Sequence, residues 1–218
     1  MRPGEPLILW DWTFNHLPDI GHRIQEHLIL TGIAVGVGFV IAFVLSLAIR
    51  QLPLLYSPIT WVAGVLYSIP SLALFALLIP FTGLSIVTAE IGLISYTLLI
   101  LIRNIVSGIR SVPPEVRESA IGMGYSQWQL LWRIELPLAT SVIIAGLRVA
   151  VVTTIGLVTV TGVIGQGGLG ALIVQGIQQF FATPLLIGAV LSIVLAVVLD
   201  GVLVTIQRLA TPWTRTTN

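Results

Sequence analysis

The sequence predicts an all-α, polytopic membrane protein with five transmembrane helices. Hydrophobic residues occupy 56% and charged residues only 9% of its 218 positions, and the mean hydropathy is +1.03. A soluble domain carries about a quarter charged residues, so this composition indicates a chain that folds within a lipid bilayer. The apolar residues also gather in separate stretches that are long enough to cross about 30 Å of hydrocarbon.

Composition also argues against several classes of function. A net charge of +1 argues against a nucleic-acid partner. The absence of cysteine excludes disulfides, thiolate metal sites and cysteine nucleophiles. His16, His22 and His27 lack the i, i+4 spacing of a zinc-binding helix, so we expect no metal site.

Residues 1–26 are expected to form an external or interfacial N-terminal segment in contact with membrane lipid. Three aromatic side chains suited to the headgroup region lie in it: Trp10, Trp12 and Phe14. The first span is predicted over residues 27–49. Small residues recur at every fourth position of this span and predict a face for close helix packing: Gly38, Ala42 and Ser46.

The second and third spans are predicted over residues 59–81 and 87–109. Pro70 lies inside the second span and predicts a kink, because a proline frees one carbonyl and disrupts the preceding turn. Such a helix either lines a pathway or is merely a kinked packing helix, and the sequence leaves both open. Glu90 and Arg103 lie toward opposite ends of the third span, from which their side chains can reach the interface.

The longest polar interval, residues 111–137, predicts two short helices at about 113–133. Pro113 and Pro114 suit the start of the first helix, where a missing N–H costs nothing. Gly124 suits its end, together with Gly122, because glycine adopts the left-handed conformation that closes a helix.

A capping box predicts the second short helix. Ser126 is followed three residues later by Gln129, so the two can cap each other's backbone amides. Pro137 is then expected to open the long apolar helix that follows.

The fourth and fifth spans are predicted over residues 138–164 and 185–206. Between them, the sequence GQGGLG at 165–170 predicts a tight re-entrant or surface turn, followed by a half-helix. Arg148 lies ~16 Å and Asp200 ~10 Å from the inner ends of these spans, at 1.5 Å per residue. Because an unpaired charge is expensive there, we expect an ion pair that holds the two helices in register. Arg208 and cavity water are the competing partners for Asp200, and lining a pathway is the alternative role.

The polar interval also carries a family motif. Six residues match the pattern E-A-A-x3-G-x9-I-x-L-P: Glu118, Ala120, Gly124, Ile134, Leu136 and Pro137. Ser119 stands in place of the first alanine. This pattern resembles that of the membrane subunits of ATP-binding-cassette importers. The run SIPSLALFALLIP around Pro70 is similar to the permeases for glycine betaine, choline and related osmoprotectants.

The resemblance implies a domain, a function and a set of partners. Residues 27–218 would form the importer's transmembrane domain, with two coupling helices that seat in a cytoplasmic ATPase subunit. A second permease copy or similar permease and an external solute-binding protein would complete the assembly in a bacterial or archaeal cell membrane. The chain itself would bind no cofactor, since ATP and Mg would sit on the ATPase. The solute would be an osmoprotectant, with methionine or another amino acid as the alternative.

Within this resemblance the glycine-rich turn would face outside, where it helps to receive the binding protein or to gate the pathway. Its candidate residues are Gly165, Gly167, Gly168 and Gly170, with Pro70 as a further pathway residue. If the coupling helices are cytoplasmic, seven arginines lie at inner ends: Arg50, Arg103, Arg110, Arg117, Arg133, Arg208 and Arg215. Only Arg2 and Arg23 then lie outside, so the positive-inside rule agrees with an external N-terminus and an internal C-terminus.

An intramembrane enzyme is the distant alternative, with Arg148, Asp200 and Glu90 as its polar side chains. The sequence contains no P-loop, no H-E-x-x-H and no G-x-S-x-G motif. An enzyme would also leave the two capped helices unexplained. We therefore expect a transport subunit without catalytic residues.

Overall fold

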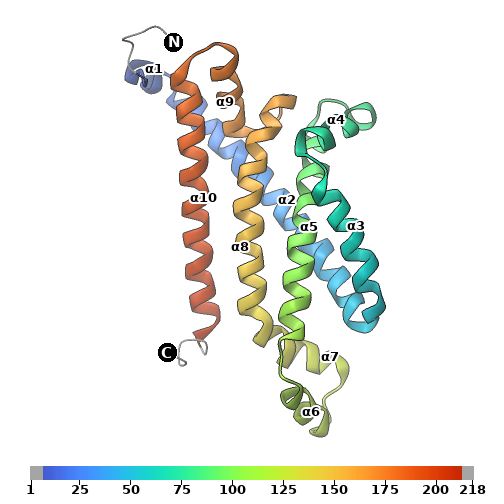
Figure 1. Cartoon of the computed structure of the whole chain (residues 1–218). Helices are drawn as coiled ribbons and strands as arrows, with labels where there is room; N and C mark the ends of the chain where they lie inside the picture. The colour runs from blue at the N-terminus through green and yellow to red at the C-terminus, as the bar shows by residue number, and fades with distance from the viewer. Residues whose placement is uncertain (1–6, 213–218) are drawn as a thin grey trace.

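The computed structural model describes residues 7–212, and every regular element among them is a helix. Long helices lie side by side, with α4 and α9 at one end of the bundle and α6 and α7 at the other (Figure 1). The helices are α1 Trp10–Asn15, α2 Leu17–Gln51, α3 Tyr56–Ser68, α4 Ser71–Thr82, α5 Ile86–Arg110, α6 Pro114–Gly122, α7 Gln127–Leu130, α8 Leu136–Thr161, α9 Gly168–Gln178 and α10 Ala182–Ala210.

Four helical segments of the described chain are long and apolar enough to cross a membrane: α2, α5, the run Gln127–Ile164 that contains α8, and α10. A fifth crossing is available if the segments Pro53–Ser68 and Ser71–Thr82 act as one broken span. These two segments meet at 97°, which also suits a re-entrant loop. The described chain thus has four such segments, or the predicted five if the bent pair is one span.

The second span is broken at Pro70 rather than kinked, so the continuous helix predicted over residues 59–81 is wrong. Proline disfavours the helical conformation of the residue before it, and Ile69 is extended at φ −68° and ψ 129°. The hydroxyl of Tyr96 on α5 donates a hydrogen bond to the carbonyl of Ile69. This bond satisfies a backbone group that the break would otherwise leave unpaired in an apolar layer.

The first long helix, α2, begins at Leu17 and continues without interruption past residue 26. The predicted boundary between residues 26 and 27 therefore falls inside a helix. The charged side chains here pair along the helix instead of ending it, with Arg23 within 3.5 Å of Asp19 and 3.2 Å of Glu26. On another face Ile20 is buried and packs in a cluster with residues of α9.

Helix α5 lies against both α2 and α8, and its middle forms the core. The most deeply buried side chains of the core include Leu101, Ile102 and Ile105. The predicted small-residue face of α2 is buried as well: Gly38, Ala42 and Ser46. A methyl group on Gly38 would come within 1.9 Å of the Thr97 hydroxyl on α5, so glycine allows the two helices to approach closely.

Candidate functional site

The polar interval folds as the sequence indicates at α6. Pro114 is the first helical residue, and Gly124 adopts the left-handed conformation at φ 85°. The amide of Tyr125 bonds to the carbonyl of Ala120, and the amide of Gly124 bonds to that of Ile121. This pair of bonds is a Schellman motif, which satisfies the carbonyls that the end of α6 leaves free.

The capping box at α7 is present. The Ser126 hydroxyl accepts from the Gln129 amide at 3.3 Å, and the Gln129 side chain accepts from the Ser126 amide at 2.8 Å. From α7 the chain continues through a π-helical turn, Leu131–Glu135, directly into α8. Pro137 lies in the first turn of α8, as predicted, although α8 continues this run without a break. Pro137 lacks the N–H that would bond to the carbonyl four residues earlier, and the wider π turn accommodates it within one helical run.

The motif residues divide between the surface and the interior. Glu118, Ser119, Gly124 and Pro137 are exposed, Ala120 is buried, and Ile134 and Leu136 are half-buried. Large apolar side chains are exposed beside them: Val116, Ile121, Met123, Trp128 and Trp132. We call these five residues the coupling surface. An apolar patch of this kind beside polar residues is typical of a protein-binding site.

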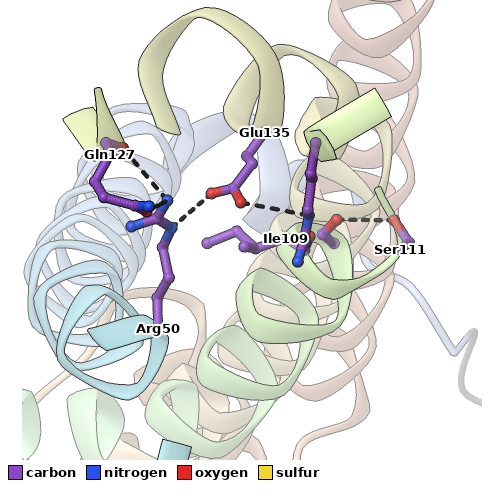
Figure 2. A network of polar contacts seen from close by, with 7 residues as sticks. Arg50, Ile109, Ser111, Gln127 and Glu135 are labelled. Carbon is purple, nitrogen blue, oxygen red and sulfur yellow. Dashed lines mark hydrogen bonds and ion pairs between the residues drawn. The ribbon is translucent and has the colours of Figure 1, made fainter. Parts of the chain in front are cut away.

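A buried carboxylate connects the coupling helices to the spans. Glu135 lies 2.6 Å from Nε of Arg50, at the end of α2, and 3.4 Å from Nε of Arg117 on α6. The guanidinium of Arg50 also reaches the backbone oxygen and the side-chain oxygen of Gln127, both at 3.3 Å (Figure 2). Arg117 in turn donates to the carbonyl of Ile109 on α5. We call Glu135, Arg50, Arg117 and Gln127 the inner network.

Sequence reasoning missed the inner network. Arg50 and Glu135 are 85 positions apart, and no local pattern connects them. The available signal was the concentration of charges in the polar interval of an otherwise apolar chain. A carboxylate as buried as that of Glu135 is ordinarily paired with a positive side chain.

The structure brings Arg148 and Asp200 together across α8 and α10. Nε of Arg148 donates to Oδ1 of Asp200 at 2.8 Å, and Nη2 donates to Oδ2 at 3.0 Å. This two-pronged geometry lies well inside the 4 Å limit for an ion pair. Gln207 on α10 accepts from Arg148 at 3.4 Å and donates to the carbonyl of Ser141 on α8 at 3.1 Å.

The glycine-rich turn has the tight geometry that its sequence indicates. Three of its glycines have positive φ: Gly165 at 75°, Gly167 at 117° and Gly168 at 37°. A methyl group on Gly170 would lie 2.2 Å from the carbonyl oxygen of Thr159, so α9 packs back against the end of α8. Gln166 donates to the carbonyl of Leu84 at 3.3 Å, which places the turn beside the α4–α5 connection.

Glu90 does not extend to the interface, as its place near a helix end had suggested. It is 8% exposed, and neither carboxylate oxygen has a hydrogen-bond partner within the described part of the chain. Arg103, by contrast, is exposed. The side chain of Glu90 is shorter and lies on the face of α5 that also carries the buried Leu93 and Thr97.

A helical bundle that presents two capped helices at one end has the form of a polytopic membrane subunit that binds another protein there. The chain belongs to the family of binding-protein-dependent transport system inner membrane components, whose family model matches residues 34–211. It is therefore a multi-pass subunit of an ATP-binding-cassette importer, a transport component rather than an enzyme. The resemblance inferred from the motif is confirmed.

Individual relatives match over most of the chain. It is 38% identical to the osmoprotectant import permease protein OsmW of Salmonella typhimurium, over 86% of this chain and 89% of that one. It is 33% identical to the glycine betaine/carnitine/choline transport system permease protein OpuCB of Bacillus subtilis, over 88% of each. A chain of the inward-facing MetNI methionine ABC transporter superimposes with a TM-score of 0.77 at 21% identity, covering 88% of this chain and 96% of that chain. This last likeness shows the shared fold.

Proposed function

We propose that this chain is the permease subunit of an ATP-driven importer for glycine betaine, choline, carnitine or a related quaternary ammonium osmoprotectant. The observation that supports this solute class best is the 38% and 33% identity, over nearly the full length, to permeases named for such solutes. Methionine or another amino acid is the second candidate, because permeases of a methionine and an amino acid transporter share the fold. Their identity of 20–21% makes that support weaker.

We propose an arrangement of partners that the surfaces of the molecule support. The coupling surface and Glu118 would seat in a cytoplasmic ATPase subunit, which would hold ATP and Mg. An external binding protein would deliver the solute at the opposite end, near α9, where the glycine-rich turn and Pro70 would help to gate the pathway. A second copy of this chain or a similar permease would complete the membrane unit. What supports this arrangement is the exposure of five large apolar residues on α6, the α6–α7 turn, α7 and the π turn.

A reconstituted uptake assay tests the function. The permease would be placed in liposomes with its ATPase and binding protein, and uptake of labelled glycine betaine, choline, carnitine and methionine would be measured with and without ATP. We expect ATP-dependent uptake of at least one quaternary ammonium compound and none of methionine. ATP-dependent uptake of methionine alone would replace this proposal with the second candidate.

The orientation predicts which positions a water-soluble thiol reagent can reach. The α6–α7 end of the bundle (Figure 1) would lie in the cytoplasm, because Arg50 and Arg110 lie in the last turns of α2 and α5 and Arg133 lies in the π turn. Arg23, by contrast, lies near the start of α2. Arg2 and Arg215, which belong to the same argument, lie outside the described residues. The chain has no cysteine of its own, so a single introduced cysteine reports one position.

In intact cells, a cysteine at Gln166 or at the more exposed Val163 should react with an impermeant maleimide. A cysteine at Met123, which is 69% exposed on the α6–α7 turn, should react only after the membrane is opened. The reverse pattern would invert the topology. Equal labelling of all three in intact cells would show that the membrane was leaky, so an impermeable cytoplasmic marker protein accompanies the assay.

Substitutions in the coupling segment should uncouple transport without preventing insertion. Gly124→Val places a β-branched side chain at φ 85°, which costs about 1–2 kcal/mol and distorts the turn between α6 and α7. Glu118→Ala removes an exposed carboxylate instead. We expect both variants to reach the membrane but to bind the ATPase less tightly and to show reduced solute-stimulated hydrolysis.

The matched control is Gly122→Val, in the same segment. Gly122 has ordinary helical φ and open space around its Cα, so valine causes no backbone strain there. Its ATPase binding should exceed that of Gly124→Val. Normal transport in both Glu118→Ala and Gly124→Val would remove this segment from the coupling role.

A further inference from the structure

A cavity of about 160 Å³ lies beside the inner network, at the junction of α2, α5 and α6. Charged and polar residues from all three helices and from the π turn line it, above all Ser46, Arg50, Arg110, Arg117 and Glu135. The cavity thus lies where the coupling segment meets the two spans. It belongs to neither the coupling surface nor the Arg148–Asp200 pair.

The lining of this cavity carries an excess of positive charge. Arg50, Arg110 and Arg117 contribute three positive charges and Glu135 one negative charge, which leaves a formal net charge of +2. Both oxygens of Glu135 already face guanidinium groups, at 2.6 Å and 3.4 Å. Arg110 lies 4.7 Å above the ring of Tyr56, a contact that does not neutralise its charge.

Two polar atoms of the lining are also left without hydrogen-bond partners among the described residues. One is the hydroxyl of Ser46, whose residue is only 1% exposed. The other is Nε of Arg117, whose 3.4 Å approach to Glu135 is an ion contact and not a hydrogen bond. A serine in a helix ordinarily donates to the carbonyl one turn earlier, and Ser46 does not. Because native proteins satisfy nearly all buried polar atoms, two orphans on residues that line one positively charged cavity indicate a missing acceptor.

We propose that this cavity binds a phosphate-type oxyanion, which accepts hydrogen bonds from Ser46 and from the arginines. A guanidinium group can donate two parallel hydrogen bonds to two oxygens of a tetrahedral oxyanion, and a serine hydroxyl supplies a further donor. A water molecule occupies about 30 Å³ of the liquid, so a cavity of about 160 Å³ has room for four oxygens around phosphorus. The oxyanion comes from a phospholipid headgroup or from free phosphate.

A bound oxyanion would link the end of α2, the end of α5 and the start of α6. The two negative charges of free phosphate, or the single negative charge of a phosphodiester, would offset the surplus positive charge of the arginines. The site would therefore brace α6 against the spans. This inference depends on the geometry of the cavity and does not depend on which solute is carried.

The test uses the purified importer complex with the full-length chain and two probes. In detergent, binding of inorganic phosphate is measured by titration calorimetry. In nanodiscs, retention of phosphatidylglycerol or phosphatidylcholine after delipidation is measured by native mass spectrometry. The variants are Ser46→Ala, which removes the orphan hydroxyl, and Arg110→Gln, which removes one charge. The matched control is Arg103→Gln, which replaces an exposed arginine of α5 that does not line the cavity.

We expect at least one probe to bind the unchanged chain and the Arg103→Gln control equally. Each cavity variant should weaken that binding by about tenfold or more, as the loss of one hydrogen bond to a charged group implies. Retention of phosphatidylglycerol alone identifies a lipid headgroup, and binding of phosphate alone identifies the free anion. Binding of neither probe, or equal binding in all variants, would overturn the proposal. Ser46→Ala removes a single atom from a helix, so it remains interpretable even if Arg110→Gln does not fold.

Discussion

Replacing Glu135 by alanine is expected to lower the free energy of unfolding by about 3 kcal/mol. The carboxylate is nearly buried, with its side chain 3% exposed, and it neutralises both Arg50 and Arg117. Breaking a buried ion pair costs about 3–5 kcal/mol, because the remaining charge loses its partner. The partial exposure of the two arginines, 16% and 31%, allows some rehydration and places the effect at the lower end. To measure this loss, the protein is unfolded in mixed micelles by increasing the fraction of a denaturing detergent, and unfolding is followed by tryptophan fluorescence.

The control for this variant is Glu115→Ala, which removes an exposed carboxylate from the first turn of α6. Its expected effect is below about 1 kcal/mol, the scale of a charge at a helix terminus. Arg50→Ala should destabilise more than Arg117→Ala, because Arg50 lies closer to Glu135 and also bonds to Gln127. Equal stability of the Glu135 and Glu115 variants would show that the inner network adds nothing to the fold.

The parts of the fold that the sequence predicted are those set by neighbouring residues. The Schellman end of α6 depends on Gly124, and the capping box depends on a serine and a glutamine three positions apart. Each pattern involves residues within one helical turn, so it can be recognised in the sequence. The same holds for the glycine-rich turn, where positive φ values select glycine.

The features that the sequence did not reveal involve contacts between distant segments. The break at Pro70 is complete because a hydroxyl from α5 satisfies the freed carbonyl of Ile69, and the sequence does not show that Tyr96 will lie there. Likewise α2 extends back to Leu17 because Ile20 packs against α9. A local pattern cannot reveal a partner that only the folded bundle brings into position.

The continuity of α7, the π turn and α8 bears on the coupling role that we propose for α6 and α7. A single helical run connects Gln127 to the fourth span, so a force applied to α7 reaches the bundle through a hydrogen-bonded backbone. Glu135 lies in that run and is held by Arg50 of the first span and Arg117 of α6. The inner network therefore ties both coupling helices to the same point, where α2 and α8 meet.

Removing either member of the Arg148–Asp200 pair is expected to impair folding severely, and removing both is expected to recover most of the loss. Each single variant leaves one charge without its partner inside a span, where such a charge is expensive. Asp200→Ala should be the worse of the two, because Arg148 then keeps only its 3.4 Å contact with Gln207. Asp200→Asn should be milder, since its amide oxygen still accepts one hydrogen bond from the guanidinium.

A double-mutant cycle measures the pair, with the yield of folded protein from gel filtration and the unfolding midpoint as readouts. The comparison pair is Asp19 and Arg23 on α2, which lie 3.5 Å apart with side chains that are 44% and 33% exposed. Exposed i, i+4 pairs contribute only a few tenths of a kcal/mol, so their single and double variants should all remain close to the unchanged protein. If the effects of Arg148→Ala and Asp200→Ala simply add, the two charges do not stabilise each other. The contact between α8 and α10 would then depend on apolar packing alone.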